Sequence, residues 1–285
     1  MDSIADALRV TGPEFSLADH DPNATPGFTG KKSEGRALLE ERTEHLAELQ
    51  EKLFAASRIG ASDRVLLVLQ GMDTSGKGGI LRHVVGAVDP QGVQIHAFKS
   101  PTKEELAHDF LWRIRRELPG PGMIGVFDRS HYEDVLIHRV RGLSTPAEIE
   151  ERYGIIQDFE ASLAENGIQV VKAMLHISKE EQGERLLERL DRPEKHWKFN
   201  PGDIDEREHW EAYQEAYQIA IERTATPISP WHVVPANRKW FARLAVQSLV
   251  IEALERINPQ WPEADFDVAH ERARLLELGA IGSAE

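Results

Sequence analysis

The chain contains 285 residues, with 34 Lys or Arg and 48 Asp or Glu, so its formal net charge at pH 7 is −14. An acidic protein of this kind repels phosphate backbones and anionic lipids, which argues against a general binder of nucleic acid or membranes but does not exclude a local basic pocket. The absence of cysteine excludes disulfides, thiolate metal sites and cysteine nucleophiles. The first residues lack the profile of a signal peptide, and the apolar runs are too short for a membrane span, so we expect a cytoplasmic protein.

The N-terminal segment differs in pattern from the rest of the chain. Residues 1–33 are rich in Pro, Gly, Asp and Thr and show no clear period, so we expect a partly irregular arm or a poorly ordered leader. From residue 33, leucines recur near helical spacing and predict a helix that ends near residue 60. Residues 64–70 form a short apolar run that is typical of a strand buried on both faces.

Short apolar runs and helical patterns then alternate along the chain. We predict further strands at 93–98, 122–127, 168–177 and 231–234, and helices at 77–88, 103–117, 146–166, 179–191, 203–223, 237–257 and 264–278. This alternation predicts an α/β fold of three layers, with a mostly parallel five-stranded sheet between helices, as one domain over residues 34–285. Trp210, Tyr213 and Tyr217 follow helical spacing, which favours packing over base stacking.

A glycine-rich segment directly follows the first predicted strand. Gly71, Gly76 and Lys77 have the spacing of a phosphate-binding loop, in which backbone N–H groups converge on phosphate oxygens and the next helix adds its positive dipole end. A plain turn is the alternative, but a turn has no use for a lysine at this point. We therefore predict a phosphate-binding loop that consists of Gly71, Met72, Asp73, Thr74, Ser75, Gly76, Lys77, Gly78 and Gly79.

This loop departs from the common pattern at Gly78, because a Ser or Thr that binds Mg²⁺ usually follows the lysine. The loop instead contains Asp73, and phosphate repels a carboxylate unless a cation or a proton lies between them. Two roles stay open: Asp73 holds Mg²⁺, directly or through water, or it receives a proton from an attacking phosphate. The structural alternative is that Asp73 only serves as an N-cap of the loop.

A second acidic position follows the strand predicted at 122–127. Asp128 stands at the carboxyl end of this strand, where enzymes with a phosphate loop hold their metal, and ligands of open α/β sheets gather at that edge. Arg129 beside it has a planar guanidinium that can bridge phosphates. Glu133 follows at a predicted helix start. An aspartate that merely caps this helix is the alternative interpretation.

The segment at about 185–203 is predicted to be a lid. Arg189, Arg192, Lys195 and Lys198 lie on both sides of a helix end at Pro193, which suits a flap that closes over phosphates and excludes water. Acidic residues are interspersed among these cations, so a solvated helix with internal salt bridges is the alternative.

Three motifs together resemble the type-2 polyphosphate kinase family. They are Gly71-Met-Asp-Thr-Ser-Gly-Lys-Gly, then Phe127-Asp-Arg-Ser-His-Tyr-Glu-Asp, and then Arg192-Pro-Glu-Lys-His-Trp-Lys-Phe-Asn-Pro. The similarity extends in order over about residues 35–257. It implies a fold like that of thymidylate kinases and an enzyme that moves phosphoryl groups between inorganic polyphosphate and nucleotides with Mg²⁺, or with Mn²⁺ in its place.

The resemblance also implies roles for single residues. Asp73, Lys77, Asp128 and Arg129 would be catalytic, with Asp73 and Asp128 at the metal and the four cations at 189–198 in the lid. Glu133 would contact the acceptor nucleotide, a purine mono- or diphosphate such as AMP, ADP or GDP. Gly79 departs from the acidic residue expected there, which leaves the subclass open. A homo-oligomer, a dimer or a tetramer, is implied as well.

Two other functions remain open at this point. An ATP-dependent kinase for a nucleotide or another small acceptor could use the same fold. A nucleotide-binding protein without turnover would also retain the loop. The rate of transfer from polyphosphate and from ATP would distinguish these functions.

Overall fold

A five-stranded sheet lies at the centre of the computed structural model, which describes residues 3–10 and 14–278. The strands are β1 (Arg64–Gln70), β2 (Val93–Ala97), β3 (Ile124–Asp128), β4 (Ile168–His176) and β5 (Trp231–Pro235). Their order in the sheet is β2-β3-β1-β4-β5, and every neighbouring pair is parallel. The structure thus confirms the predicted α/β fold with a parallel sheet of five strands.

The strands form from short apolar runs because helices cover both faces of the sheet. Six consecutive residues of β1, residues 65–70, are buried. Alternate side chains of β1 enter two separate cores: Leu67 and Leu69 pack in one, and Leu66 and Val68 pack in the other. A strand buried on both sides needs this continuous apolar run.

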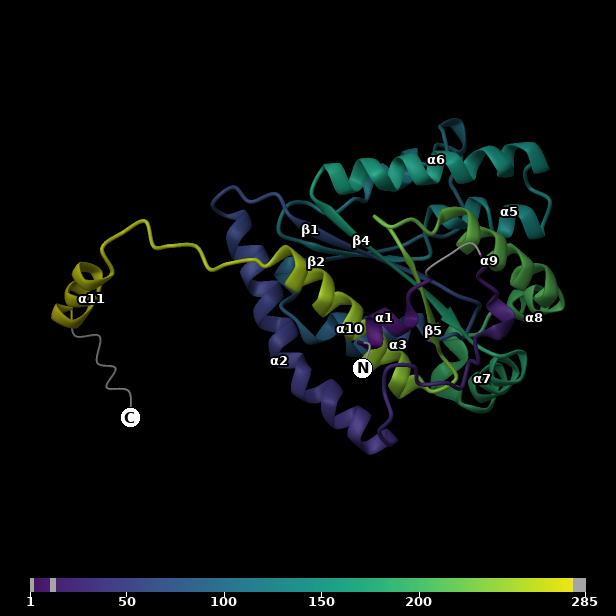
Figure 1. Cartoon of the computed structure of the whole chain (residues 1–285), viewed down its shortest axis with the longest axis horizontal. Helices are drawn as coiled ribbons and strands as arrows, with labels where there is room; N and C mark the ends of the chain where they lie inside the picture. Colours follow the sequence, from purple (N-terminus) through teal and green to yellow (C-terminus); the bar gives the residue numbers. More distant parts are fainter. Residues whose placement is uncertain (1–2, 11–13, 279–285) are drawn as a thin grey trace.

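Two layers of helices enclose the sheet (Figure 1). One layer contains α1 (Ile4–Leu8), α2 (Lys32–Ser57), α3 (Lys77–His83) and α10 (Lys239–Ile257), whose apolar residues share one core. The other contains α4 (Trp112–Arg116), α5 (Ile137–Val140), α6 (Pro146–Glu165) and α9 (Trp210–Thr224). Helices α7 (Lys179–Asp191) and α8 (Gly202–Glu208) lie together beside the ends of the strands (Figure 1). The predicted three-layer architecture is therefore present.

Three of the helices predicted before β5 are shorter or broken. The helix expected at 77–88 ends at His83 and continues as a 3₁₀ turn at Val85–Ala87, in a stretch that contains Gly86. The segment 103–117 consists of a 3₁₀ turn at Glu105–Ala107 and α4, because the carboxylate of Asp109 accepts the N–H of Leu111 in place of a helical carbonyl. The segment 203–223 is divided at His209 into α8 and α9.

The described residues of the predicted N-terminal arm pack on the domain. Helix α1 buries Ile4, Ala5 and Leu8 in the core, and the N–H of Val10 donates to the carbonyl of Trp231 at 2.9 Å. The expectation of a poorly ordered leader is therefore wrong for residues 3–10, since the apolar stripe of a five-residue helix was overlooked. Parts of the predicted arm (1–2 and 11–13) and of the predicted domain (279–285) lie outside the described residues.

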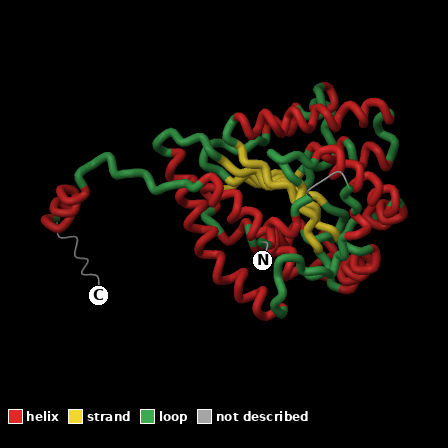
Figure 2. Tube along the Cα trace, in the orientation of Figure 1, coloured by secondary structure: helices red, strands yellow, loops and turns green. Residues whose placement is uncertain are grey.

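The C-terminal segment contrasts with this N-terminal packing. After α10 ends at Ile257, the chain runs away from the sheet and its helices to α11 (Val268–Glu277), which lies apart from the rest (Figures 1 and 2). Helix α11 is shorter than the helix expected at 264–278, and none of its residues is buried. Within residues 3–10 and 14–278, no helix combines the length and the apolar character that a bilayer crossing requires.

Candidate active site

The predicted site residues come from the carboxyl ends of two adjacent strands. Asp128 ends β3 and lies opposite Leu69 of β1 in the parallel register. The predicted phosphate loop begins two residues after Leu69, at Gly71, directly beyond the end of β1. Parallel pairing therefore brings the loop and the Asp128–Arg129 pair to one edge of the sheet.

The loop adopts a conformation that requires glycine at its start. Gly71 has a φ angle of 147°, and a Cβ at this position would lie 2.7 Å from Ser75 Oγ and 2.8 Å from the carbonyl oxygen of Leu175. Within the described residues, no protein acceptor engages the backbone N–H groups of Thr74, Gly76 or Lys77. The loop therefore has free N–H donors at the N-terminus of α3, as an anion site needs.

Two side chains hold the first residue of the loop. Lys77 is nearly buried, and its ammonium group donates to the carbonyl of Gly71 at 2.8 Å. The N–H of Gly71 donates to the hydroxyl oxygen of Tyr217 at 3.1 Å. Tyr217 is buried in α9, which confirms the expected packing role, and burial raises the pKa of its hydroxyl. Sequence spacing did not reveal this contact with the loop.

Asp73 and Arg129 make a direct contact across the site. The guanidinium of Arg129 donates to the Asp73 carboxylate at 2.9 Å, and both side chains are partly exposed. Arg129 has a φ angle of 64° and Thr74 one of 63°, a conformation that costs a residue with a side chain about 1–3 kcal/mol. The surrounding structure thus holds the loop and the turn after β3 in strained geometries where their charged groups meet.

Several carboxylates surround Arg129. Burial by itself lowers the pKa of Arg129, but the nearby charges of Glu133, Asp73 and Asp128 outweigh burial and raise it. Arg129 therefore stays a cation, although its side chain is only partly exposed. No hydrogen bond or ion pair among the described residues engages the carboxylate of Asp128.

Glu133 lies beside the same cation and is held by a buried amide. Burial raises the pKa of Glu133, and the charges of Arg129 and Lys77 oppose this effect. With the Gln70 amide oriented to satisfy both of its ends, its nitrogen donates to Glu133 Oε1 at 3.1 Å and its oxygen accepts from Ser130 Oγ at 3.0 Å. Gln70 is the last residue of β1, and its polarity in an apolar run was the overlooked signal.

The donor set fits a hard cation that is shared with phosphates. Within residues 3–10 and 14–278, no cluster of three carboxylate or imidazole side chains is suited to a metal. Mg²⁺ commonly uses only one or two carboxylates, with water and substrate phosphates as its other ligands. Asp128 has an uncommitted carboxylate beside Arg129, and Asp73 is bound by that same arginine. These two residues therefore suit an ion that also binds water and substrate phosphates. They do not form a site in which the protein supplies all the ligands.

The four predicted lid cations are engaged with groups of their own region. Arg189 donates to Asp203 Oδ2 and to the carbonyl of Lys198, both at 3.1 Å. The ammonium of Lys198 lies 4.8 Å from the ring centroid of Trp197. Burial raises the pKa of Asp203, and the charge of Asp73 adds to this effect, so the Arg189–Asp203 pair lies near the phosphate loop.

The carboxylate of Glu188 forms ion pairs with two further lid cations, Arg192 and Lys195. Its carboxylate makes ion pairs with Arg192 at 3.2 Å, with Lys195, and with Lys239 of α10 at 3.5 Å. A hydrogen bond from Lys195, followed by the charges around it, lowers the pKa of Glu188 to about 2. The contacts of the lid are thus those of the internally salt-bridged alternative, and the role of its cations toward a substrate stays a prediction.

Arg185 supports the loop, although the sequence placed it at the start of the lid. Its buried guanidinium donates to the carbonyls of Thr74 at 2.9 Å and Ser75 at 3.0 Å. It also donates to the carbonyls of Ala236 at 2.6 Å and Asn237 at 3.0 Å, directly after β5. One side chain therefore ties the outer rim of the phosphate loop to the far strand of the sheet.

Gln182, one turn earlier in α7, makes a parallel contact. Its amide nitrogen donates to the carbonyl of Asp73 at 3.3 Å, and its oxygen accepts from Arg207 at 2.9 Å. Carbonyls held on the outside leave the N–H groups of the loop turned toward the site. Gln182 and Arg185 were missed as functional residues because only the fold shows that their face of α7 is covered by the loop.

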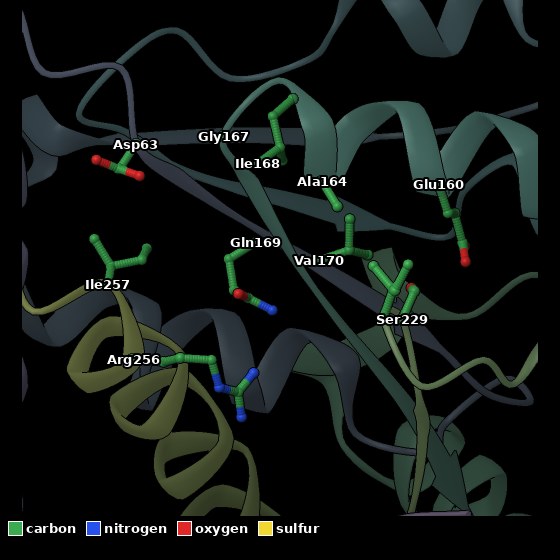
Figure 3. Close-up of a pocket in the computed structure, with 11 residues that line it drawn as sticks. Asp63, Glu160, Ala164, Gly167, Ile168, Gln169, Val170, Ser229, Arg256 and Ile257 are labelled. Carbon is green, nitrogen blue, oxygen red and sulfur yellow. The ribbon is translucent and has the colours of Figure 1, made fainter.

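A pocket of about 290 Å³ lies away from this site (Figure 3). Asp63, Gln169 and Arg256 line it, from the start of β1, the start of β4 and the end of α10. It therefore opens at the opposite edge of the sheet. Glu160 forms part of its wall but is committed to a buried ion pair with Lys172 at 2.6 Å.

Comparison with known proteins gives consistent results. The family model for polyphosphate kinase 2 (PPK2) matches residues 29–262. The AMP/ADP-polyphosphate phosphotransferase of Meiothermus ruber is 43% identical over 251 residues, which cover 88% of this chain and 92% of the relative. The ADP-polyphosphate phosphotransferase of Rhodopseudomonas palustris is 41% identical over 269 residues, with 90% and 91% covered. A crystal structure of polyphosphate kinase 2 from Arthrobacter aurescens TC1 superposes with a TM-score of 0.94 at 59% identity, over 97% of both chains.

Proposed function

The chain belongs to the polyphosphate kinase 2 family, and from this premise we propose which substrates it takes and which residues carry the reaction. It is a polyphosphate:nucleotide phosphotransferase. The two similar relatives are named for AMP and ADP or for ADP alone. We assign AMP and ADP as acceptors, with GDP as a further one, and ADP and ATP as products.

The observation that carries this assignment is the contact between Asp73 and Arg129. This contact joins the phosphate loop after β1 to the end of β3, where Asp128 lies. The loop and the Asp128–Arg129 pair therefore lie next to each other. Phosphoryl transfer needs mainly alignment and neutralisation of charge. Arg129, which lies among carboxylates beside the phosphate loop, supplies both the alignment and the neutralisation of charge.

The donor polyphosphate is assigned to the loop. The free N–H groups of Thr74, Gly76 and Lys77 and the positive end of α3 would bind its terminal phosphate oxygens. The ammonium of Lys77 has three N–H donors, so it would bind an oxygen of the transferred group while it keeps its contact with the carbonyl of Gly71. Because Arg185 holds the carbonyls of Thr74 and Ser75 outward, the donors do not need to reorganise during transfer.

The acceptor phosphate is assigned to the side of Arg129. The guanidinium would orient it in line with the phosphorus of the donor, so that the acceptor oxygen forms the new P–O bond while the bond to the shortened polyphosphate breaks. Glu133, beside Arg129, would face the acceptor nucleotide. In this arrangement Asp73 fixes the direction of Arg129.

Asp73 and Asp128 would hold the metal. Mg²⁺, or Mn²⁺ in its place, would there offset the charge that develops on the phosphate oxygens. The Asp128 carboxylate is free to bind it among the described residues, and Asp73 brings the second carboxylate through its contact with Arg129. Asp128→Asn should therefore raise the Mg²⁺ concentration needed for half-maximal rate, while a lid variant such as Lys198→Ala should leave it unchanged.

A donor and acceptor matrix tests the assigned activity. Polyphosphate or ATP is incubated with AMP, ADP, GMP or GDP in the presence of Mg²⁺, and the products are measured. We expect ATP from polyphosphate and ADP, and ADP from polyphosphate and AMP. If neither product forms, the assignment is wrong. Transfer from ATP at least as fast as from polyphosphate would instead indicate an ATP-dependent kinase, and nucleotide binding without transfer would indicate a non-catalytic protein.

A further inference from the structure

A buried ion pair lies between the sheet and α6, outside the site described above. Lys172 of β4 stands between Val68 of β1 and Trp231 of β5 in the parallel register. Its ammonium donates to Oε2 of Glu160 at 2.6 Å and to the carbonyl of Thr224 at 2.8 Å. Lys172 is 0% exposed, and Glu160, which comes from α6, is 1% exposed. Two charges have therefore been taken out of water, which costs free energy.

Stability alone does not account for this pair. Burial by itself raises the pKa of Glu160, but the charge of Lys172 outweighs burial and lowers the pKa to about 2, so the pair is ionised at neutral pH. Replacement of a buried ion pair by apolar residues of similar volume is often neutral or stabilising. The value of the pair for the protein therefore lies in what it holds in place.

The pair binds the turn that follows β3. Oε1 of Glu160 accepts from the hydroxyl of Tyr132 at 2.7 Å, and the ammonium of Lys172 donates to the same hydroxyl at 3.1 Å. Nε2 of His131 lies 3.2 Å from Oε1 of Glu160, and because a carboxylate only accepts, His131 is the donor. His131 and Tyr132 are both 0% exposed, and they are the third and fourth residues after Asp128. The turn is therefore anchored in the core directly beyond the site.

Arg129 lies between the end of β3 and this anchored turn. Its φ angle of 64° is one that a residue with a side chain keeps only where the surrounding structure holds it there. On one side, the N–H of Arg129 donates to the carbonyl of Leu69 at 3.0 Å. On the other side, the N–H of Tyr132 donates to Ser130 Oγ at 3.2 Å, and the ion pair holds the ring of Tyr132. The chain is thus fixed on both sides of the residue that contacts Asp73.

We propose that Glu160 and Lys172 are positioning residues for the transfer reaction. Through Tyr132, their ion pair holds the turn in which Arg129 takes its strained conformation and in which Glu133 lies. Neither residue of the pair reaches the substrate, because both are enclosed in the core. The proposal rests on the roles assigned above to Arg129 and Glu133 toward the acceptor. The phosphate loop has its own anchor in α7, so the effect should fall on the acceptor and not on the donor.

Replacement of the whole pair tests the proposal. Glu160→Met together with Lys172→Met removes both charges, so that no lone charge stays buried. We expect the KM for ADP to rise about tenfold and kcat to fall about tenfold, while the KM for polyphosphate stays within about twofold. Circular dichroism melts should show a folded chain with a Tm within about 5 °C of that of the unchanged protein. Unchanged KM and kcat would overturn the proposal, since a merely structural pair leaves the folded enzyme as active as before.

A smaller change covers the case in which the double variant does not fold. Tyr132→Phe keeps the ring and the ion pair and removes only the hydroxyl that joins them. It should raise the KM for ADP by about threefold and leave the KM for polyphosphate unchanged. The control is Gln247→Leu in α10, since Gln247 is also 0% exposed but donates to the carbonyl of Leu39 in the other helical layer. The control should leave both KM values unchanged, and equal changes in Tyr132→Phe and Gln247→Leu would contradict the positioning role.

Crystal structures separate failure of this proposal from failure of the assigned reaction. In the folded variants, Arg129 should leave its positive φ angle and lose the contact with Asp73, which is 2.9 Å long in the unchanged protein. If Arg129 keeps both in the variants, the positioning role is wrong, whatever the activity. If the contact is lost but the unchanged protein transfers no phosphoryl group, the positioning role is supported and the assigned reaction is wrong.

Discussion

The phosphate loop and the lid both carry the charges expected of a phosphotransferase, but they hold them differently. In the loop region, Arg185 donates to backbone carbonyls on two separate segments, and Lys77 is fixed by the carbonyl of Gly71. In the lid, Arg192 is bound to the carboxylates of Glu188 and Glu194, and Lys195 is bound to that of Glu188. The first set of contacts ties distant parts of the fold together, whereas the second joins neighbours within one helix end.

Under the proposed roles of the loop and the lid, this difference corresponds to two kinds of preparation for one substrate. Groups fixed on strand ends by buried backbone contacts are already placed for transfer and need no rearrangement. Exposed ion pairs are worth only about 0–1 kcal/mol each, so phosphate can displace their carboxylates at little cost. We therefore expect substitutions near the loop to reduce the rate or the stability strongly, and those in the lid to change mainly substrate affinity.

The largest effect should come from Lys77→Ala. Loss of a preorganised charge at the transferred phosphate should lower kcat by about a thousandfold. The matched control is Lys198→Ala, which removes a lid cation whose contact is the face of Trp197 and should cost less than about tenfold. ATP formation from polyphosphate and ADP measures both. Equal losses of kcat in the two variants would show that the cations of the lid and of the loop act alike, and would contradict the proposed difference between them.

Arg185→Met should affect stability most. The change keeps the volume of the side chain but leaves the carbonyls of Thr74, Ser75, Ala236 and Asn237 without this donor in a buried place. We expect the free energy of unfolding to fall by about 3 kcal/mol in urea titrations. Arg192→Met in the lid should cost less than about 1 kcal/mol, because its partners are exposed. A smaller loss for Arg185 than for Arg192 would contradict the anchoring role.

His176, the last residue of β4, should make the sheet edge sensitive to acid. Burial, followed by the charge of His20, lowers the pKa of His176 to about 4. Because this pKa lies below the unfolded value of about 6.5, the stability from the neutral imidazole is complete above pH 6.5 and is lost as the pH falls toward 4. The loss at pH 5, relative to pH 7.5, should be about 2 kcal/mol.

Urea unfolding at both pH values checks this expectation. His176→Gln should show a smaller decrease between pH 7.5 and pH 5 than the unchanged protein. His196→Gln, at an exposed position of the lid, is the control and should retain the full decrease. If both variants lose the same amount as the unchanged protein, the acid sensitivity has another origin.

The smallest effect is expected from Glu188→Gln. Neutralisation of this carboxylate leaves the charges of Lys195 and Lys239 available to the substrate, and it removes one of the two carboxylates that bind Arg192. The KM for polyphosphate should fall by about threefold with kcat nearly unchanged. Glu184→Gln removes an equal charge from an exposed position one turn earlier in α7 and should change KM less. A higher KM in Glu188→Gln would mean that the pairs position the lid instead of competing with substrate.

Much of the site could be predicted because it is encoded by local spacing. The loop at 71–79 and the Asp128–Arg129 pair are short motifs that follow buried strands, and parallel strands place their carboxyl ends together. Helices that depend on single competing contacts, such as the segment broken at Asp109, could not be predicted in this way. The role of the cations at 189–198 in a lid stays a prediction from sequence, and their partners could not be predicted, since side-chain pairing depends on how the chain turns at Pro193.

The sequence by itself thus determined the class of fold, the phosphate loop and the acidic strand end, because hydrophobic period and glycine spacing act over a few residues. Only the tertiary structure decided that Arg129 contacts Asp73, that Arg185 holds the loop, and that residues 259–278 leave the domain. These contacts join segments 56 and 111 residues apart, and no local pattern measures the distance between such segments. Their energy arises from burial and from pairing of polar groups, which exist only once the sheet has formed.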